Sequence, residues 1–186
     1  MTLPEAARVT PSTAAARSGA GGTPPAAAPT IVDLFAEQVR GTPDGVAVVA
    51  QGVECSYAEL DARADRLARR LLRLGVRPEQ CVGVLADRSA DLVAALLAVV
   101  RAGGAYVPLD TRAPAGRMTA VLTGAGVSVL VTDRAWRATA ERVHGGHLVV
   151  IEDDEDRVTE PGTALPALVH PDNLAYVMFT SGSTGV

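Results

Sequence analysis

The chain has 186 residues, of which 48% are hydrophobic, and a formal net charge of −4 at pH 7. This length suits one ordinary domain with a buried core, and the acidic balance argues against nonspecific binding to nucleic acid. All 17 Lys+Arg residues are arginines, so a Schiff-base lysine and a P-loop lysine are both excluded within this chain.

The sequence contains no stretch of the roughly 18 consecutive apolar residues that a membrane span requires. Its N-terminus lacks the apolar segment of a signal peptide. We therefore expect a cytoplasmic protein that does not contact a membrane. The two cysteines, Cys55 and Cys81, have no Cys or His neighbour at metal-ligand spacing, so we expect reduced thiols and assign no metal ligand.

Residues 1–29 are rich in Ala, Pro, Gly, Ser and Thr, and they are predicted to form a disordered leader because they cannot bury enough apolar surface. The folded part is predicted to cover residues 30–186. It opens with an amphipathic helix, in which Thr30 and Asp33 form a capping pattern and Gly41 marks the end.

Two strand candidates, residues 46–50 and 53–55, flank the dipeptide Gln51-Gly52 and predict a hairpin. The clearest helix signal follows at once. Ser56 and Glu59 form a capping box, and Gly75 ends the segment. Apolar residues recur between them at helical spacing: Leu60, Ala64, Leu67, Leu71 and Leu74.

The arginines of this helix fall mostly on its other faces: Arg63, Arg66, Arg69, Arg70 and Arg73. They are open to two interpretations, a solvated helix face with Asp61 and Asp65 nearby or a binding patch. The solvated face is favoured because charged runs on helices are usually exposed.

From residue 81 onward, strands alternate with helices. Strands are predicted at residues 81–86, 105–109, 127–132 and 148–151, with helices at 90–101 and around 134–143. The helix at 90–101 is apolar on nearly all sides, which predicts that it packs between layers. This alternation is typical of the α/β class, with a mainly parallel sheet flanked by helices.

An acidic run, residues 152–156, could chelate a cation. We favour a solvated loop, because consecutive carboxylates repel one another. The three histidines show no catalytic spacing to a serine or cysteine, and we assign no catalytic residue.

The last stretch of the chain carries the strongest functional signal. Residues 174–179 are apolar and rich in strand formers, which predicts a strand. Six small residues follow: Thr180, Ser181, Gly182, Ser183, Thr184 and Gly185. Their glycines allow backbone N–H groups to converge, and their hydroxyls add donors, so the loop can cradle a phosphate. The alternative is a flexible tail without a ligand. A P-loop is excluded, because the glycine spacing is wrong and no lysine follows.

The sequence L-A-Y-V-M-F-T-S-G-S-T-G at residues 174–185 resembles the phosphate loop of adenylate-forming enzymes, in the form found in amino-acid adenylation domains of nonribosomal peptide synthetases. S-Y-A-E-L at residues 56–60 and R-A-G-G-A-Y-V-P-L-D at residues 101–110 resemble two further elements, in the family's order. The resemblance covers roughly residues 30–186. It departs at residues 110–118, where the family shows D-P-x-Y-P-x-E-R-L.

The resemblance implies the N-terminal portion of the adenylate-forming fold, a partial AMP-binding domain. It implies that ATP and Mg²⁺ convert an amino acid into an aminoacyl-adenylate, which passes to the phosphopantetheine arm of a peptidyl carrier domain in the same synthetase. The residues of the predicted loop, 180–185, would hold the β- and γ-phosphates.

The family's remaining site residues would lie beyond Val186, where the chain stops inside the motif. We therefore expect a fragment that is inactive alone and does not reveal which amino acid is activated. Three alternatives stay open. The chain could be a noncatalytic or split module that docks on or complements a synthetase, or an acyl- or aryl-acid ligase of the same superfamily. An ordinary nucleotide-binding domain is less well supported, because G-x-G-x-x-G is absent.

Overall fold

A computed structural model of the chain describes residues 28–153, 165 and 168–179. The helices are α1 (Ile31–Gly41), α2 (Tyr57–Arg73), α3 (Ala90–Arg101), α4 (Ala115–Gly124) and α5 (Arg137–Val143). The strands are β1 (Val46–Ala50), β2 (Val53–Ser56), β3 (Cys81–Leu85), β4 (Ala105–Pro108), β5 (Val129–Thr132) and β6 (His147–Val150). Nearly all of the predicted leader, the acidic residues 154–156 and the predicted loop 180–185 lie outside the described residues.

A parallel sheet forms the centre of the fold, with the strand order β4-β3-β5-β6. Val82 of β3 pairs with Tyr106 of β4 on one side and with Val129 of β5 on the other. Each parallel crossover passes through a helix, as the connection between parallel strands requires. The predicted α/β fold with a mainly parallel sheet is thus confirmed.

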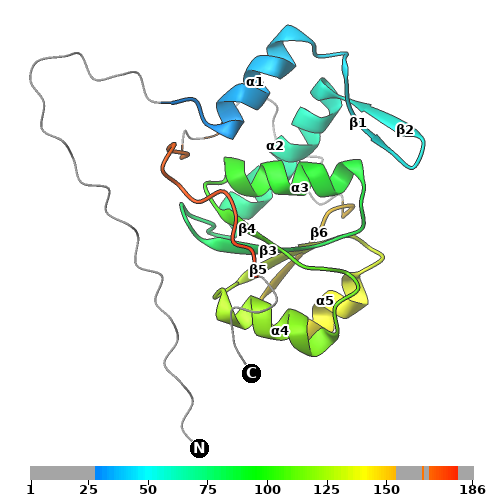
Figure 1. Cartoon of the computed structure of the whole chain (residues 1–186), viewed down its shortest axis with the longest axis vertical. Helices are drawn as coiled ribbons and strands as arrows, with labels where there is room; N and C mark the ends of the chain where they lie inside the picture. Colours follow the sequence, from blue (N-terminus) through cyan, green and yellow to red (C-terminus); the bar gives the residue numbers. More distant parts are fainter. Residues whose placement is uncertain (1–27, 154–164, 166–167, 180–186) are drawn as a thin grey trace, which may run out of the picture.

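Helices cover both faces of this sheet (Figure 1). On one face α2 and α3 pack against β3, β5 and β6 through a cluster that includes Leu71, Val82, Val99 and Val131. On the other face, α4 and α5 pack through a smaller cluster. Because α3 packs against the sheet, α2 and the β1–β2 hairpin, it buries residues on several sides, as its apolar sequence predicts.

The first two helices begin where the sequence predicts. Thr30 and Asp33 form a reciprocal capping box on α1, and Ser56 and Glu59 form another on α2. Gly75 follows α2 with a φ of 84°, a conformation that favours glycine after a helix.

The predicted hairpin is confirmed as an antiparallel β1–β2 pair. Gln51 and Gly52 at its turn both have positive φ, 53° and 77°, so the turn has the twist that suits a two-residue hairpin. The hairpin and α1 pack outside α2 and α3 around Cys55 and Leu60.

Arg101 connects this outer layer to the core. It is one of the few buried charged side chains among the described residues, at 9% exposed, and it forms an ion pair with Asp61 of α2. Its guanidinium carbon lies 5.5 Å from the centre of the Phe35 ring of α1. One side chain of α3 therefore holds both α1 and α2.

Two predictions need correction. The sequence reading named no helix at Ala115–Gly124, yet α4 forms there, with Met118 and Leu122 buried against the sheet. The strand predicted over residues 174–179 reduces to an isolated parallel bridge between Tyr106 and Tyr176. In both places the outcome depends on packing against the sheet, which local sequence signals do not report. Across the described residues no helix meets the length and apolarity needed to cross a membrane.

Candidate functional site

A cavity at the carboxyl ends of β3 and β4 has a volume of about 1100 Å³. We call it the main cleft. Open α/β sheets bind ligands at this edge, outside the carboxyl ends of the strands. Its wall includes residues that follow β3 (Ala86, Asp87, Arg88), residues 108–114 at the end of β4 and after it, Arg117, Met118 and Val121 of α4, and the pair Met178 and Phe179. Gln51 and Leu92 complete the lining.

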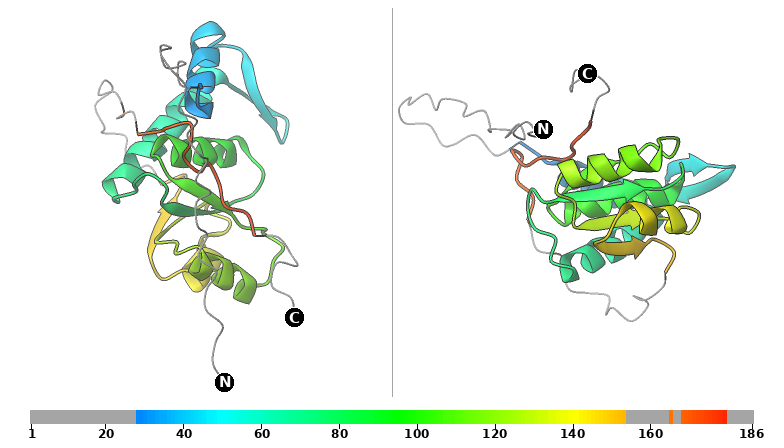
Figure 2. Two further views of the ribbon diagram at one scale, coloured as in Figure 1. Left: turned by 60° about the vertical axis from the view of Figure 1, so that its left-hand side comes forward. Right: turned by 90° about the horizontal axis from the view of Figure 1, so that it is seen from below.

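Residues 168–179 reach the main cleft along the outer edge of β4 (Figures 1 and 2, red). The Tyr106 N–H donates to the Ala175 carbonyl at 3.1 Å, and the Val177 N–H donates to the Tyr106 carbonyl at 3.0 Å. The rings of Tyr106 and Tyr176 stack with centres 5.6 Å apart. Because this bridge is parallel, the segment leaves at the sheet edge where β3 and β4 end.

Glu79 holds this segment near its middle, at residues 173 and 174. Its Oε1 accepts from the side-chain amide of Asn173 and from the Leu174 N–H, each at 3.1 Å. At the start of the segment, Leu168 lies over Gly103. Gly103 has a φ of 82°, and a Cβ added there would sit 3.4 Å from the Leu168 Cβ. Gly103 of the A-G-G-A element therefore allows a close approach of chain segments.

Phe179 ends the described part of this segment inside the main cleft. Its ring lies 3.6 Å from the position of a Cβ added at Gly124, the last residue of α4. The next residue is Thr180, the first of the predicted phosphate loop. The loop itself lies outside the described residues, so its role remains a prediction; Phe179, the residue before it, lines the main cleft.

Two carboxylates of the main cleft, those of Asp110 and Asp87, already accept hydrogen bonds from other side chains. Arg112 Nε donates to Asp110 Oδ1 at 3.1 Å, and this side-chain bond, with a further bond from the Arg112 N–H, holds the pKa of Asp110 below its ordinary value. Asp87 accepts from Trp136 Nε1 at 2.9 Å, and its own N–H donates to Asp133 Oδ2 at 2.8 Å. These bonds fix the loops that follow β3 and β4.

Two cations of the main cleft remain available. Arg88 and Arg117 are exposed, and neither side chain makes a hydrogen bond or ion pair with another described residue. A guanidinium presents a planar set of donors that suits phosphate oxygens. The sequence reading did not select either residue. For Arg88 a signal existed, its position just beyond a buried parallel strand.

At the departures from the family pattern, the described residues are packed and hydrogen-bonded. Ala113 stands where the family has tyrosine, and it packs against the cluster of Met118 and Leu122. Its N–H donates to the Asp110 carbonyl at 2.9 Å. The described residues include no group of three His, Cys, Asp or Glu side chains placed to hold a metal ion, so we assign no Mg²⁺ ligand among them.

Comparison with known proteins gives a consistent result. A sequence profile described as "AMP-binding enzyme" matches residues 35–186. The chain is 38% identical over 153 residues to gramicidin S synthase 2 of Brevibacillus brevis, covering 82% of this chain and 3% of that protein. It is 43% identical over 162 residues to phosphinothricin tripeptide synthetase PhsC of Streptomyces viridochromogenes, covering 84% of this chain and 15% of that protein.

Solved structures show the same similarity. The nonribosomal peptide synthetase FmoA3, in a form bound to α-methyl-L-serine-AMP, matches with a TM-score of 0.72 and 35% identity, covering 80% of this chain and 17% of that one. The NpsA N-terminal subdomain of Klebsiella oxytoca matches with a TM-score of 0.70 and 27% identity, covering 83% of this chain and 39% of that one. The chain therefore spans a small part of the length of its relatives.

Proposed function

Because the chain belongs to the family of AMP-binding enzymes, we propose that it forms the N-terminal portion of an amino-acid-activating domain of a nonribosomal peptide synthetase. The observation that carries this proposal is the course of residues 168–179, which run parallel to β4 and deliver Phe179 to the main cleft. The relatives named above, at 38% and 43% identity, are a gramicidin synthase and a tripeptide synthetase, which supports an amino acid as the substrate.

In the proposed reaction, a carboxylate oxygen of the amino acid attacks the α-phosphorus of ATP. The bond from that phosphorus to the bridging oxygen breaks, giving an aminoacyl-adenylate and pyrophosphate. The contribution of this chain is to hold the departing phosphates: residues 180–185 supply hydrogen-bond donors, and Arg88 and Arg117 supply positive charge at the main cleft. Fixed donors and cations of this kind stabilise phosphoryl oxygens without a covalent step.

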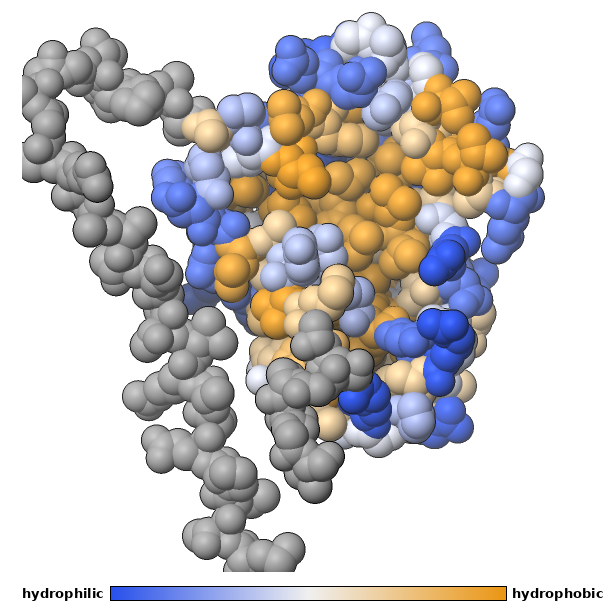
Figure 3. All heavy atoms as spheres, viewed as in Figure 1, coloured by the Kyte–Doolittle hydropathy of each residue, from blue (hydrophilic) through white to orange (hydrophobic). Residues whose placement is uncertain are grey.

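The proposal includes partners outside this chain. Mg²⁺ would neutralise charge on the phosphates, and a peptidyl carrier domain would accept the acyl group on its phosphopantetheine arm. Large apolar side chains are exposed on α1, on the β1–β2 hairpin and along residues 174–179: Ile31, Leu34, Val46, Val49, Val53, Leu174, Tyr176, Met178 and Phe179. Apolar side chains gather over the face seen in Figure 3, and we propose that other parts of the synthetase cover it.

We also propose that these 186 residues do not catalyse adenylation alone. The chain covers 17% of the FmoA3 chain and has no lysine. The purified chain, mixed with Mg²⁺-ATP and each of the twenty common amino acids, should show pyrophosphate exchange at the background rate. Exchange clearly above background with any of them would contradict this part of the proposal.

Binding of the phosphates can be tested separately from catalysis. We expect the chain to bind Mg²⁺-ATP weakly in a calorimetric or NMR titration. The double variant Arg88→Gln/Arg117→Gln should weaken binding by roughly tenfold or more, because each charged hydrogen bond contributes about 1.5–3 kcal/mol. Gly182→Val should also weaken it, by restricting the loop backbone.

Arg40→Gln provides the matched control, since Arg40 is exposed on α1 and carries the same charge. Equal losses in Arg40→Gln and in either single variant, Arg88→Gln or Arg117→Gln, would show that ATP is held by overall charge. That outcome would remove the main cleft as the phosphate site.

An aryl-acid substrate is the second candidate. The NpsA subdomain has been solved with 3-hydroxyanthranilyl-AMSN and with 3-hydroxybenzoyl-AMSN, at 26% identity to this chain. The higher identity to peptide synthetases favours an amino acid. Exchange assays of the complete domain with amino acids and with hydroxybenzoates would separate the two, because each substrate class gives exchange in one arm only.

A further inference from the structure

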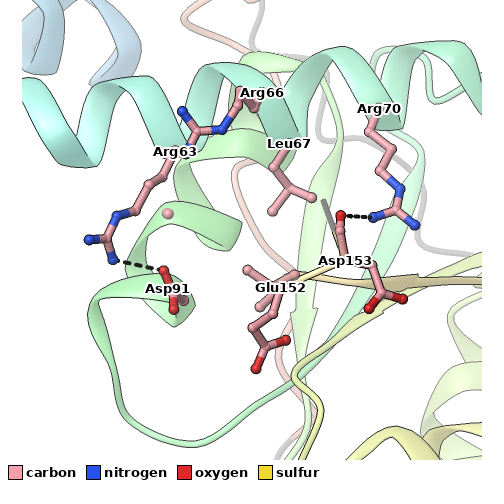
Figure 4. Close-up of a pocket in the computed structure, with 9 residues that line it drawn as sticks. Arg63, Arg66, Leu67, Arg70, Asp91, Glu152 and Asp153 are labelled. Carbon is pink, nitrogen blue, oxygen red and sulfur yellow. Dashed lines mark hydrogen bonds and ion pairs between the residues drawn. The ribbon is translucent and has the colours of Figure 1, made fainter. Parts of the chain in front are cut away.

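A second cavity, of about 290 Å³, lies under α2 at the carboxyl end of β6 (Figure 4). We call it the α2 pocket. It is lined by Arg63, Arg66, Leu67 and Arg70 of α2, Asp91 and Ala94 of α3, and Ile151, Glu152 and Asp153 after β6. None of these residues lines the main cleft, so the α2 pocket needs its own explanation.

The cationic wall of the α2 pocket is one face of a helix. Arg63, Arg66 and Arg70 are spaced three and four residues apart, so their side chains are neighbours. Arg63 Nη1 pairs with Asp91 Oδ1 at 2.9 Å, and Arg70 Nη1 donates to the Val150 carbonyl at 2.9 Å. The Arg66 side chain makes no hydrogen bond or ion pair with any described residue.

Glu152 and Asp153, the two acidic residues on the opposite wall, bond to residues that lie outside the pocket. The Glu152 carboxylate accepts from the Arg134 N–H at 3.1 and 3.0 Å, and Figure 4 shows it pointing away from α2. Asp153 pairs with Arg134 at 3.5 Å and with Arg137 at 3.7 Å. The Asp153 charge is therefore paired outside the pocket, the Glu152 carboxylate is hydrogen-bonded there, and among the described residues no anion pairs with Arg66.

The floor of the α2 pocket is apolar. Leu67 points into its centre in Figure 4, and Ala94 and Ile151 also contribute to the lining. The volume lies at the lower end of the range for small-molecule sites, roughly 300–1,000 Å³. A charged rim on Arg66 and Arg63 above an apolar floor suits a small ligand with an anionic head and an apolar body.

We propose that the α2 pocket binds a small organic oxyanion, with a carboxylate or phosphate head on Arg66 and Arg63 and an apolar body against Leu67, Ala94 and Ile151. The fork of a guanidinium matches either head group. This site is independent of the proposed adenylation function, because it shares no residue with the main cleft.

The test is a titration of the full chain with benzoate, phenyl phosphate and inorganic phosphate, followed by two-dimensional NMR of the backbone amides. We expect saturable shifts of amides in α2 and in residues 151–153 with benzoate, phenyl phosphate or both. The tighter of the two identifies the head group. Inorganic phosphate, which has no apolar body, should bind at least tenfold more weakly than the tighter aryl ligand.

Arg66→Gln should lower the affinity for the aryl ligand by about tenfold, the equivalent of about 1.4 kcal/mol. This variant removes no described contact, and circular dichroism would confirm its fold. Arg40→Gln carries the same charge change on α1 and should bind normally. Equal losses in both variants, or tight binding of inorganic phosphate alone, would overturn the proposal.

The chain's own acidic residues offer a rival occupant. Asp154, Glu155 and Asp156 directly follow the pocket residue Asp153 in sequence. We expect the triple variant Asp154→Asn/Glu155→Gln/Asp156→Asn to bind the aryl ligand with an affinity close to that of the parent chain. If the ligand binds only to the triple variant, the acidic run is the natural occupant and the small-ligand proposal fails.

Discussion

On one face of the parallel sheet, α2 and α3 each begin at a serine whose hydroxyl accepts from a backbone N–H three residues later. On the other face, neither α4 nor α5 has a side-chain cap, and α5 has only seven residues. The first face carries the larger buried cluster, including Leu71, Val99 and Val131. The second depends on a few side chains such as Met118 and Leu122.

This difference follows the placement of the main cleft. Arg117, Met118 and Val121 of α4 line it, and Phe179 packs on the last residue of α4. The α2 and α3 face acts as a scaffold whose helices start from local signals, whereas α4 is held to the sheet by tertiary contacts. A Cβ added at Gly83 would lie 2.7 Å from Leu122 Cδ2, so α4 packs directly over the backbone of β3.

Truncating one core leucine on each face gives the largest expected effect. Leu71→Ala should lower the free energy of unfolding by about 3–4 kcal/mol, because Leu71 is fully buried in the larger cluster. Leu122→Ala should cost about 2–3 kcal/mol, because its neighbours border an open cleft and can relax. Urea denaturation would measure both. An equal or larger loss for Leu122→Ala would show that the two faces are equally well packed.

The sequence predicted the scaffold face well because its signals are local. Ser56 and Glu59 lie three residues apart, and their capping box is recognisable without knowledge of the fold. The helix α4 has no such signal: glycine stands near its start and at its end, and no side chain caps it. Its helical state depends on Met118 and Leu122 meeting the sheet.

In the candidate site too, some features could be predicted from local sequence and others depend on tertiary packing. The predicted loop at residues 180–185 came from residue types alone, whereas Arg88 and Arg117 line one cleft only because the fold brings the end of β3 and α4 together. The strand predicted over residues 174–179 was too long, because β4 offers this segment a single bridge at Tyr106. Strand propensity cannot reveal how much of a neighbouring edge is available.

Removing the cap of α2 is the next largest change. Ser56→Ala should destabilise the chain by about 1 kcal/mol, because the Glu59 N–H loses its acceptor. Ser56→Asn is the control, since asparagine retains a side-chain acceptor at this position and should restore most of the loss. Thermal and urea denaturation would compare the three proteins. If Ser56→Ala proves neutral, the scaffold helix does not depend on its local signal.

Strengthening α4 should have a smaller and opposite effect. Gly116 lies in the first turn of α4, its φ is not positive, and an added Cβ meets nothing within 4 Å. Gly116→Ala should therefore stabilise the chain by about 0.4–1 kcal/mol, by restricting the unfolded backbone and favouring the helix. Gly126→Ala, at a φ of 63°, should destabilise it instead. A neutral Gly116→Ala would indicate that α4 is not limited by its weak local signal.

The smallest effect concerns acid pH, and it should also separate the two faces. The backbone hydrogen bond from the Ser56 N–H lowers the pKa of Glu59, and the side-chain hydrogen bond from Thr30 lowers the pKa of Asp33. A carboxyl whose pKa is lower in the folded state adds stability that is complete above its unfolded pKa, about 4.3 for Glu and 3.9 for Asp. This stability is lost as the pH falls through the folded pKa.

No acidic residue lies in the first turn of α4 or α5, so those helices lack this source of acid sensitivity. We expect the stability difference between the parent chain and Glu59→Gln to be constant above about pH 5 and to shrink at lower pH. Hydrogen exchange should show amides at the start of α2 losing protection in acid before those at the start of α4. Glu59→Gln keeps a capping side chain that does not titrate, so it should remove the difference in pH response at α2. Equal acid sensitivity at the starts of α2 and α4 would mean that the capping boxes do not set the response, because α4 has no carboxylate there to protonate.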